Sequence, residues 1–264
     1  MSQAHDTWTS GRAYESYVGR WSRLVAPRFL AWLGIAPGAR WLDVGCGTGL
    51  LTVTTLQMAA PTAVRGVDPS EEYLAYAREH IADTRASFAL GTASTLDEAD
   101  ASYDAVISGL MLNFVPEPVS AVAELVRVTR LGGTMAAYVW DYAGKMQFMR
   151  YFWDAAVALD PAARMLDEGT RFPICHPSPL ATLFREAELH NVETITIDVE
   201  TAFRDFDDYW SPFLGGQGPA PNYAMSLSEE RRVALRERIR ASLPIAPDGS
   251  IALIARAWAV RGIR

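Results

Sequence analysis

A short apolar run that leads through three alternate glycines into a helical pattern is the feature that most constrains the fold. Residues 41–44 read Trp-Leu-Asp-Val, and Gly45, Gly47 and Gly49 follow before residues 50–60 continue with the apolar spacing of a helix. Glycine reaches positive φ freely, whereas other residues lose roughly 1–2 kcal/mol there. The stretch therefore predicts a strand, a tight loop whose backbone a ligand can approach, and a helix.

The same alternation continues to residue 140. Helices are predicted after Ser70, a good N-cap, and from Pro118, with Val119, Val122 and Val126 lining the second. Strands alternating with helices at this spacing favour right-handed crossovers and a mainly parallel, doubly wound α/β sheet, which binds ligands at the carboxyl ends of its strands. The further strands are predicted at residues 63–67, 87–90, 105–108 and 134–140.

Composition narrows the class of protein. The formal net charge of -7 repels phosphate backbones and argues against a nucleic-acid partner. No apolar run reaches the roughly 20 residues that span a bilayer, and no basic start with an apolar segment opens the sequence, so we expect a cytoplasmic protein away from membranes. The two cysteines, Cys46 and Cys175, stand apart from any metal-ligand spacing, so no metal and no disulfide is predicted.

Two carboxylates indicate what the glycine loop binds. Asp43 stands two residues before the first glycine, where it would repel a pyrophosphate but suits an ammonium and a sulfonium cation. Asp68 ends the second predicted strand, where a carboxylate can accept both hydroxyls of a ribose. The spacing Gly-x-Gly-x-Gly also differs from the Gly-x-Gly-x-x-Gly of dinucleotide enzymes. The pair of acids predicts a nucleoside with a cationic tail.

Four motifs in order resemble the class I S-adenosylmethionine-dependent methyltransferases, of the bacterial small-molecule type, over residues 40–140. They are Leu-Asp-Val-Gly-Cys-Gly-Thr-Gly, Gly-Val-Asp-Pro-Ser, Tyr-Asp-Ala-Val-Ile-Ser and Leu-Gly-Gly. The resemblance implies a Rossmann-like seven-stranded sheet whose last hairpin is antiparallel. It also implies S-adenosylmethionine as cofactor and methyl transfer as the reaction.

By this resemblance, the first glycines and Cys46 face the methionine part of the cofactor, Asp68 and Pro69 face the ribose and adenine edge, and residues 108–110 line the floor near the reactive methyl. Thr92 stands where many relatives carry an aspartate that binds the adenine amino group; its hydroxyl can still form a hydrogen bond there, and weaker recognition of the nucleotide is expected. The implied cofactor residues in the core are Asp43, Gly45, Cys46, Gly47, Gly49, Asp68, Pro69, Thr92, Ala93, Ser94, Ser108 and Leu110.

Residues 14–29 resemble the N-terminal helical lid of such enzymes. Tyr17, Arg20 and Trp21 are the residues expected over the cofactor, and Arg20 could pair with its carboxylate in a bidentate manner. The alternative is that Arg20 is a solvated helix residue and Trp21 anchors the core.

The whole chain is expected to form one methyltransferase domain, 1–264. Its expected parts are lid helices (1–37), a cofactor-binding core (38–141), an inserted helical cap (142–177 and 203–245) and the remaining core (178–202 and 246–264), with the last strands at 192–199 and 251–260.

Aromatic residues concentrated in the cap segments could form an apolar substrate pocket or simply a core, and both are expected in part. The substrate-binding candidates are Asn113, Trp140, Tyr142 and Trp210, and no catalytic residue is assigned. Cys46 is disfavoured as a nucleophile because no basic neighbour lowers its pKa.

The expected function is in-line transfer of the methyl group to a small, partly apolar or aromatic molecule by a monomer or homodimer. Two alternatives stay open: a catalytically silent S-adenosylmethionine-binding protein, and a nicotinamide-dependent oxidoreductase, which Asp43 and the glycine spacing disfavour.

Overall fold

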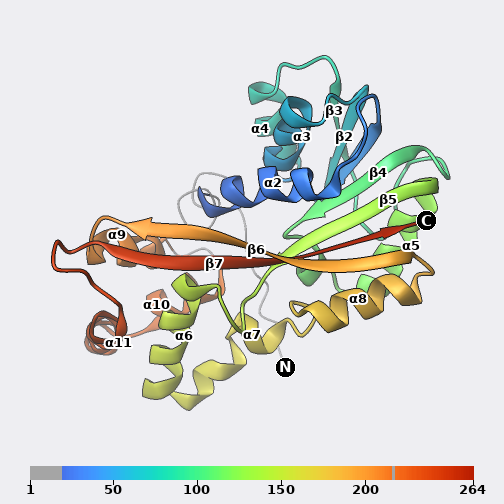
Figure 1. Ribbon diagram of the computed structural model, residues 1–264. Helices are drawn as coiled ribbons and strands as arrows, with labels where there is room; N and C mark the ends of the chain where they lie inside the picture. The colour runs from blue at the N-terminus through green and yellow to red at the C-terminus, as the bar shows by residue number, and fades with distance from the viewer. Residues whose placement is uncertain (1–19, 216–217) are drawn as a thin grey trace. The chain divides into compact units, whose positions relative to one another are not determined.

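The computed structural model describes residues 20–215 and 218–264, which separate into two compact units (Figure 1). The sheet unit comprises residues 23–140, 174–197 and 257–264. The helical unit comprises the described residues among 20–22, 141–173 and 198–256. That the chain acts as one domain stays a prediction.

Seven strands form one sheet in the order β3-β2-β1-β4-β5-β7-β6. Strands β1 to β5 pair in parallel, whereas β7 runs antiparallel to β5 from Trp140↔Ala257 to Thr134↔Ile263. The predicted doubly wound sheet with an antiparallel end is thus confirmed. The strands are β1 (Arg40–Val44), β2 (Ala63–Asp68), β3 (Ala86–Leu90), β4 (Tyr103–Gly109), β5 (Thr129–Trp140), β6 (His190–Phe203) and β7 (Ile251–Ile263).

Helices cover both faces of the sheet unit, α3 and α4 on one side and α5 with α8 on the other (Figure 1). Ser70 caps α4 as predicted, since its Oγ accepts a hydrogen bond from the Tyr73 N–H at 3.3 Å. Helix α2 packs Phe29 edge-on against Tyr138 of β5 at 4.9 Å. The helices are α2 (Arg20–Leu33), α3 (Leu50–Met58), α4 (Glu71–His80), α5 (Pro118–Val128) and α8 (Pro177–Glu186).

Of the three valines predicted to line α5, one lies on the exposed side of the helix. Val119 is 61% exposed, while Val122 is fully buried. The helix begins at Pro118, and at 3.6 residues per turn its buried stripe follows Ala121, Leu125 and Val128. Val119 and Val126 match the apolar spacing but lie to one side of that stripe.

The helical unit packs around a cluster of aromatic side chains. Phe148 stacks on Phe213 at 4.5 Å, and the Tyr209 hydroxyl donates a hydrogen bond to the Phe148 carbonyl at 2.7 Å. The aromatic residues predicted in the cap therefore supply a core. The elements of this unit are α6 (Gln147–Leu159), η3 (Pro161–Met165), α7 (Glu168–Arg171), α9 (Phe206–Trp210), η4 (Ser211–Leu214), α10 (Pro219–Ser226) and α11 (Glu229–Ser242).

Candidate functional site

The glycine loop lies at the carboxyl end of β1 and is tied to its neighbour β2. Gly45, Gly47 and Gly49 have φ of +73°, +53° and +87°. The N–H groups of Gly45 and Cys46 both donate to the Val67 carbonyl, at 2.8 and 3.1 Å. The loop is thereby fixed where parallel α/β sheets bind ligands.

The three glycines are required for different reasons. A Cβ at Gly45 would lie 2.4 Å from Cγ of Met111, and one at Gly49 would lie 2.4 Å from Cδ1 of Ile81. These two glycines make room for the protein's own side chains. At Gly47, by contrast, no described atom would lie within 4 Å of a Cβ. Of the three, Gly47 alone opens onto free space, so it is the glycine at which a ligand can reach the backbone.

This difference predicts the effect of alanine at Gly47. Gly47→Ala will destabilise the fold by only about 1–2 kcal/mol, the cost of positive φ, yet it will weaken binding of a ligand at the loop at least tenfold. Gly38→Ala is the matched control, because Gly38 also has positive φ (+87°) with no described atom near its Cβ position, and lies before β1. Chemical denaturation and calorimetry measure the two effects. Equal ligand affinities in the two variants would contradict the assignment.

Asp68 is held against this loop. The side chain is 7% exposed, its Oδ2 accepts a hydrogen bond from the Gly47 N–H at 2.9 Å, and its Oδ1 accepts one from the Ser70 N–H at 2.9 Å. Burial raises the pKa of this carboxyl, and the two backbone hydrogen bonds act in the opposite direction. The structure thus brings the predicted acid and the open glycine together.

Asp43 is fully buried, and only one of its oxygens is bonded. The Thr52 hydroxyl donates to Oδ2 at 2.7 Å, while Oδ1 has no hydrogen-bond partner among the residues described. Burial raises the pKa of Asp43 to about 7; the Thr52 hydrogen bond lowers it and the charge of Asp68 adds to the rise. A carboxyl held this way ionises fully when a cation comes near it.

Cys46 lies in the same loop as a buried thiol. Burial raises its pKa well above the usual range, and the charges of Asp43 and Asp68 add to the rise. Because the thiolate is the nucleophile, this environment disfavours nucleophilic chemistry, as predicted.

The segment after β3 follows the same strand ends. The Gly91 N–H donates to the Asp68 carbonyl at 3.1 Å, which joins the segment to the end of β2. Thr92 and Thr95 form an isolated bridge around Ala93, which is buried, and Ser94, which is exposed. The implied cofactor residues Thr92, Ala93 and Ser94 therefore follow the strand that is tied to Asp68.

At the carboxyl ends of β4 and β5, and in the turn after β4, several buried polar atoms have no hydrogen-bond partner among the described residues. Ser108 is fully buried and Asn113 is 7% exposed, and neither side chain bonds to any described residue. Leu110 has φ of +60° and donates its N–H to the Tyr138 carbonyl at 2.8 Å. Trp140, at the end of β5, also keeps its indole N–H unbonded within the described chain. These predicted residues thus share one edge of the sheet.

The other aromatic candidates lie in the helical unit. Trp21 is buried and packs edge-on against Phe203 at 5.4 Å, which agrees with the alternative that it anchors a core. Tyr142 packs against Phe172 at 5.8 Å and Trp210 against Phe213 at 5.9 Å. Tyr17 and the side chain of Arg20 lie outside the described residues.

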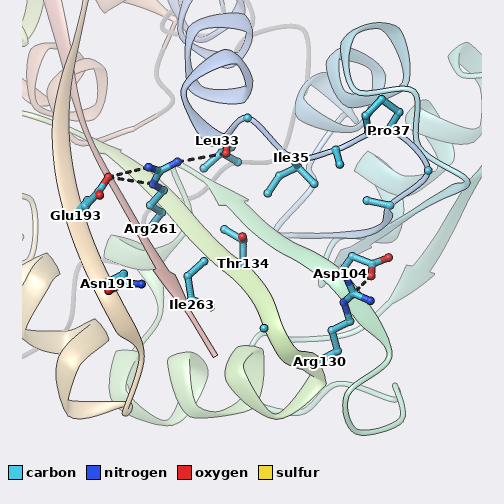
Figure 2. Close-up of a pocket in the computed structure, with 15 residues that line it drawn as sticks. Leu33, Ile35, Pro37, Asp104, Arg130, Thr134, Asn191, Glu193, Arg261 and Ile263 are labelled. Carbon is cyan, nitrogen blue, oxygen red and sulfur yellow. Dashed lines mark hydrogen bonds and ion pairs between the residues drawn. The ribbon is translucent and has the colours of Figure 1, made fainter.

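A separate hollow of about 650 Å³ opens at the other end of β4 and β5 (Figure 2). Its charged side chains are already paired: Arg130 with Asp104 at 2.7 Å, and Arg261 with Glu193 at 2.8 Å. Arg261 also donates to the Leu33 carbonyl at 3.2 Å. The hollow lies at the amino ends of the parallel strands and is therefore distinct from the glycine-loop edge.

Comparison with known proteins agrees with this geometry. A family described as "Methyltransferase domain" matches residues 42–137, which run from β1 into β5. The match makes residues 42–137 similar to a methyltransferase domain. The matched segment contains the glycine loop, both acids, Ser108 and Asn113.

The chain is 32% identical over 158 residues to the ubiquinone biosynthesis O-methyltransferase of Xanthomonas campestris pv. campestris. The match covers 58% of this chain and 63% of that relative's length. Among solved structures, the YcgJ protein of Bacillus subtilis matches with a TM-score of 0.60 at 17% identity. The match covers 91% of this chain and 98% of the YcgJ chain.

A second solved structure is phosphoethanolamine N-methyltransferase 2 of Haemonchus contortus, in complex with phosphomonomethylethanolamine and S-adenosylhomocysteine. Its TM-score is 0.58 at 16% identity, and the match covers 96% of this chain and 56% of that one. At these identities the two structures show that the chain shares their fold.

Proposed function

We propose that this chain binds S-adenosylmethionine at the glycine loop and transfers its methyl group to a small molecule. The observation that carries the proposal is the open backbone at Gly47, which bonds one buried acid and follows the strand that carries the other. Asp68 already bonds the Gly47 N–H, and Asp43 keeps one oxygen unbonded among the described residues.

The residues present fit this cofactor. A cationic amino acid end would satisfy the spare oxygen of Asp43 and stabilise its ionised form. Each oxygen of Asp68 accepts one backbone N–H and has a further lone pair, so the carboxylate can also accept ribose hydroxyls. A pyrophosphate would instead meet two acids, which disfavours a nicotinamide cofactor.

The chemistry that the bound cofactor supplies is a methyl group on an activated sulfonium. The chain chiefly has to align the acceptor with it, and alignment alone can lower the barrier by roughly 7–11 kcal/mol. A general base is needed only when the acceptor keeps its proton at neutral pH. The glycine loop, fixed by two N–H bonds to the Val67 carbonyl, supplies a rigid floor for that alignment.

A small acceptor is supported by the name of the Xanthomonas relative, an O-methyltransferase of ubiquinone biosynthesis, and by the net charge of -7, which disfavours nucleic acid. Among the described helices, none has the length and apolarity to cross a bilayer. We further propose a cytoplasmic protein that acts as a monomer or homodimer.

Titration calorimetry tests the cofactor. We expect S-adenosylmethionine and S-adenosylhomocysteine to bind in the micromolar range and NADH not to bind. Incubation of the purified chain with methyl-labelled cofactor and a metabolite extract should then move label into the small-molecule fraction. Binding without transfer would favour the catalytically silent alternative, and no binding at millimolar cofactor would remove the proposal.

A further inference from the structure

Asn113 is a buried amide whose two polar atoms are both unbonded. The residue is 7% exposed, and neither its Nδ2 nor its Oδ1 has a hydrogen-bond partner in the described parts of the chain. In folded proteins the large majority of buried side-chain polar atoms have a hydrogen-bond partner, because a buried atom without one costs free energy. A bound ligand with matching groups would satisfy both atoms.

The position of Asn113 is fixed by the backbone around it. Helix η2 (Leu112–Phe114) carries the residue, and the Phe114 N–H closes this turn on the Met111 carbonyl at 2.8 Å. The Leu110 N–H ties the turn to Tyr138 of β5. Met111 lies against Gly45, since its Cγ would be 2.4 Å from a Cβ there. The amide therefore belongs to the strand ends that carry the glycine loop.

A second unbonded group belongs to the same strand end. Ser108 is the penultimate residue of β4 and fully buried, and its hydroxyl bonds to no described residue. The carboxyl end of β4 thus presents a hydroxyl and an amide that the described protein leaves unsatisfied.

The chemistry of an amide narrows what it can recognise. Nδ2 donates and Oδ1 accepts, so one group that has an acceptor next to a donor satisfies both at once. A carboxylate would leave Oδ1 unbonded, and an ammonium group would leave Nδ2 unbonded.

We propose that Asn113 binds and orients the methyl acceptor, and that this acceptor carries a neutral hydrogen-bond donor beside an acceptor, as in a primary amide. The inference rests on the proposed function, because the cofactor and the acceptor must meet at one edge of the sheet.

Three probes of equal ring size test this recognition on the protein saturated with S-adenosylhomocysteine. Benzamide has the donor and the acceptor, acetophenone is nearly isosteric but lacks the donor, and benzoate has two acceptors and a charge. By ligand-observed NMR titration, we expect benzamide to bind at least tenfold more tightly than the other two. In Asn113→Leu this preference will disappear, while the affinity for S-adenosylhomocysteine stays within twofold.

Thermal unfolding without ligand separates this role from a structural one. Because leucine removes an unbonded amide from the interior, Asn113→Leu will keep or raise the melting temperature by a few degrees. Asn113→Asp is a second variant, which keeps the shape of the side chain but loses the donor. It should also lose the preference for benzamide. Val119→Ala, at an exposed position of α5, is the control and should change neither binding nor melting.

The outcomes distinguish the two proposals. If the wild type fails to bind S-adenosylhomocysteine, the proposed function fails. If it binds that molecule but shows no preference for benzamide, or if Asn113→Leu and Asn113→Asp keep the preference, the role of Asn113 is overturned while the cofactor site stands. A melting temperature of Asn113→Leu that falls by more than a few degrees would also overturn it.

Discussion

Replacing Asp68 with alanine will weaken binding of S-adenosylmethionine by about 10²- to 10⁴-fold. The carboxylate bonds the Gly47 N–H and the Ser70 N–H and is predicted to accept the ribose hydroxyls as well. Hydrogen bonds to a charged group are worth roughly 1.5–3 kcal/mol each, so the loss of two ribose bonds accounts for the expected range. Calorimetry at pH 7 measures the change.

Asp83→Ala provides the matched control. Asp83 is also an acid near a strand of the sheet, but it pairs with Arg85 at 2.6 Å before β3 begins. Its replacement should leave the affinity within twofold. If Asp68→Ala bound the cofactor as tightly as this control, the ribose role of Asp68 would be wrong.

The second large effect concerns Asp43 and pH. Its pKa is about 7 in the folded chain, against 3.8 as the ordinary value, so the folded state holds the proton more tightly. Asp43 therefore makes its full contribution to the free energy of unfolding below about pH 4, and this contribution is lost as the pH rises through about 7. The difference between the two pKa values is worth about 4 kcal/mol at most. Asp43→Asn, which keeps an acceptor for Thr52, should abolish this part of the pH dependence.

Urea denaturation of the ligand-free wild type and of Asp43→Asn at pH 5 and pH 8 measures the difference. The variant should be the more stable at pH 8. It should also bind S-adenosylmethionine more weakly, and the wild type alone should release about one proton on binding at pH 6, as calorimetry in buffers of different ionisation enthalpy reports. If the free energy of unfolding changed with pH in the same way for both proteins, folding would not shift the pKa of Asp43, and the prediction would be wrong.

Local signals explain why so much of the sheet unit could be predicted. The β1 strand, the glycine loop and α3 follow one another in the sequence, and the apolar pattern and the need for positive φ are both readable there. The N-cap at Ser70 is local in the same sense, because its partner is the Tyr73 N–H.

What the sequence could not predict depends on contacts between distant residues. Gly45 is needed because of Met111, and Gly49 because of Ile81, so only the folded chain distinguishes these two from Gly47. Apolar spacing likewise predicts that Phe148 lies on the buried side of its helix, but it does not predict that the ring stacks on Phe213. The sequence could not predict that the Asn113 amide is buried without a hydrogen-bond partner among the described residues, because burial and missing partners are properties of the packing.

A crystal structure of the chain with S-adenosylhomocysteine tests the central claim most directly. We predict the ribose hydroxyls within hydrogen-bond distance of Asp68 and the amino acid end over Gly47, with the free oxygen of Asp43 engaged. A nucleoside bound elsewhere, for example in the hollow between Arg130 and Arg261 (Figure 2), with Asp43 still bonded only to Thr52, would contradict the account.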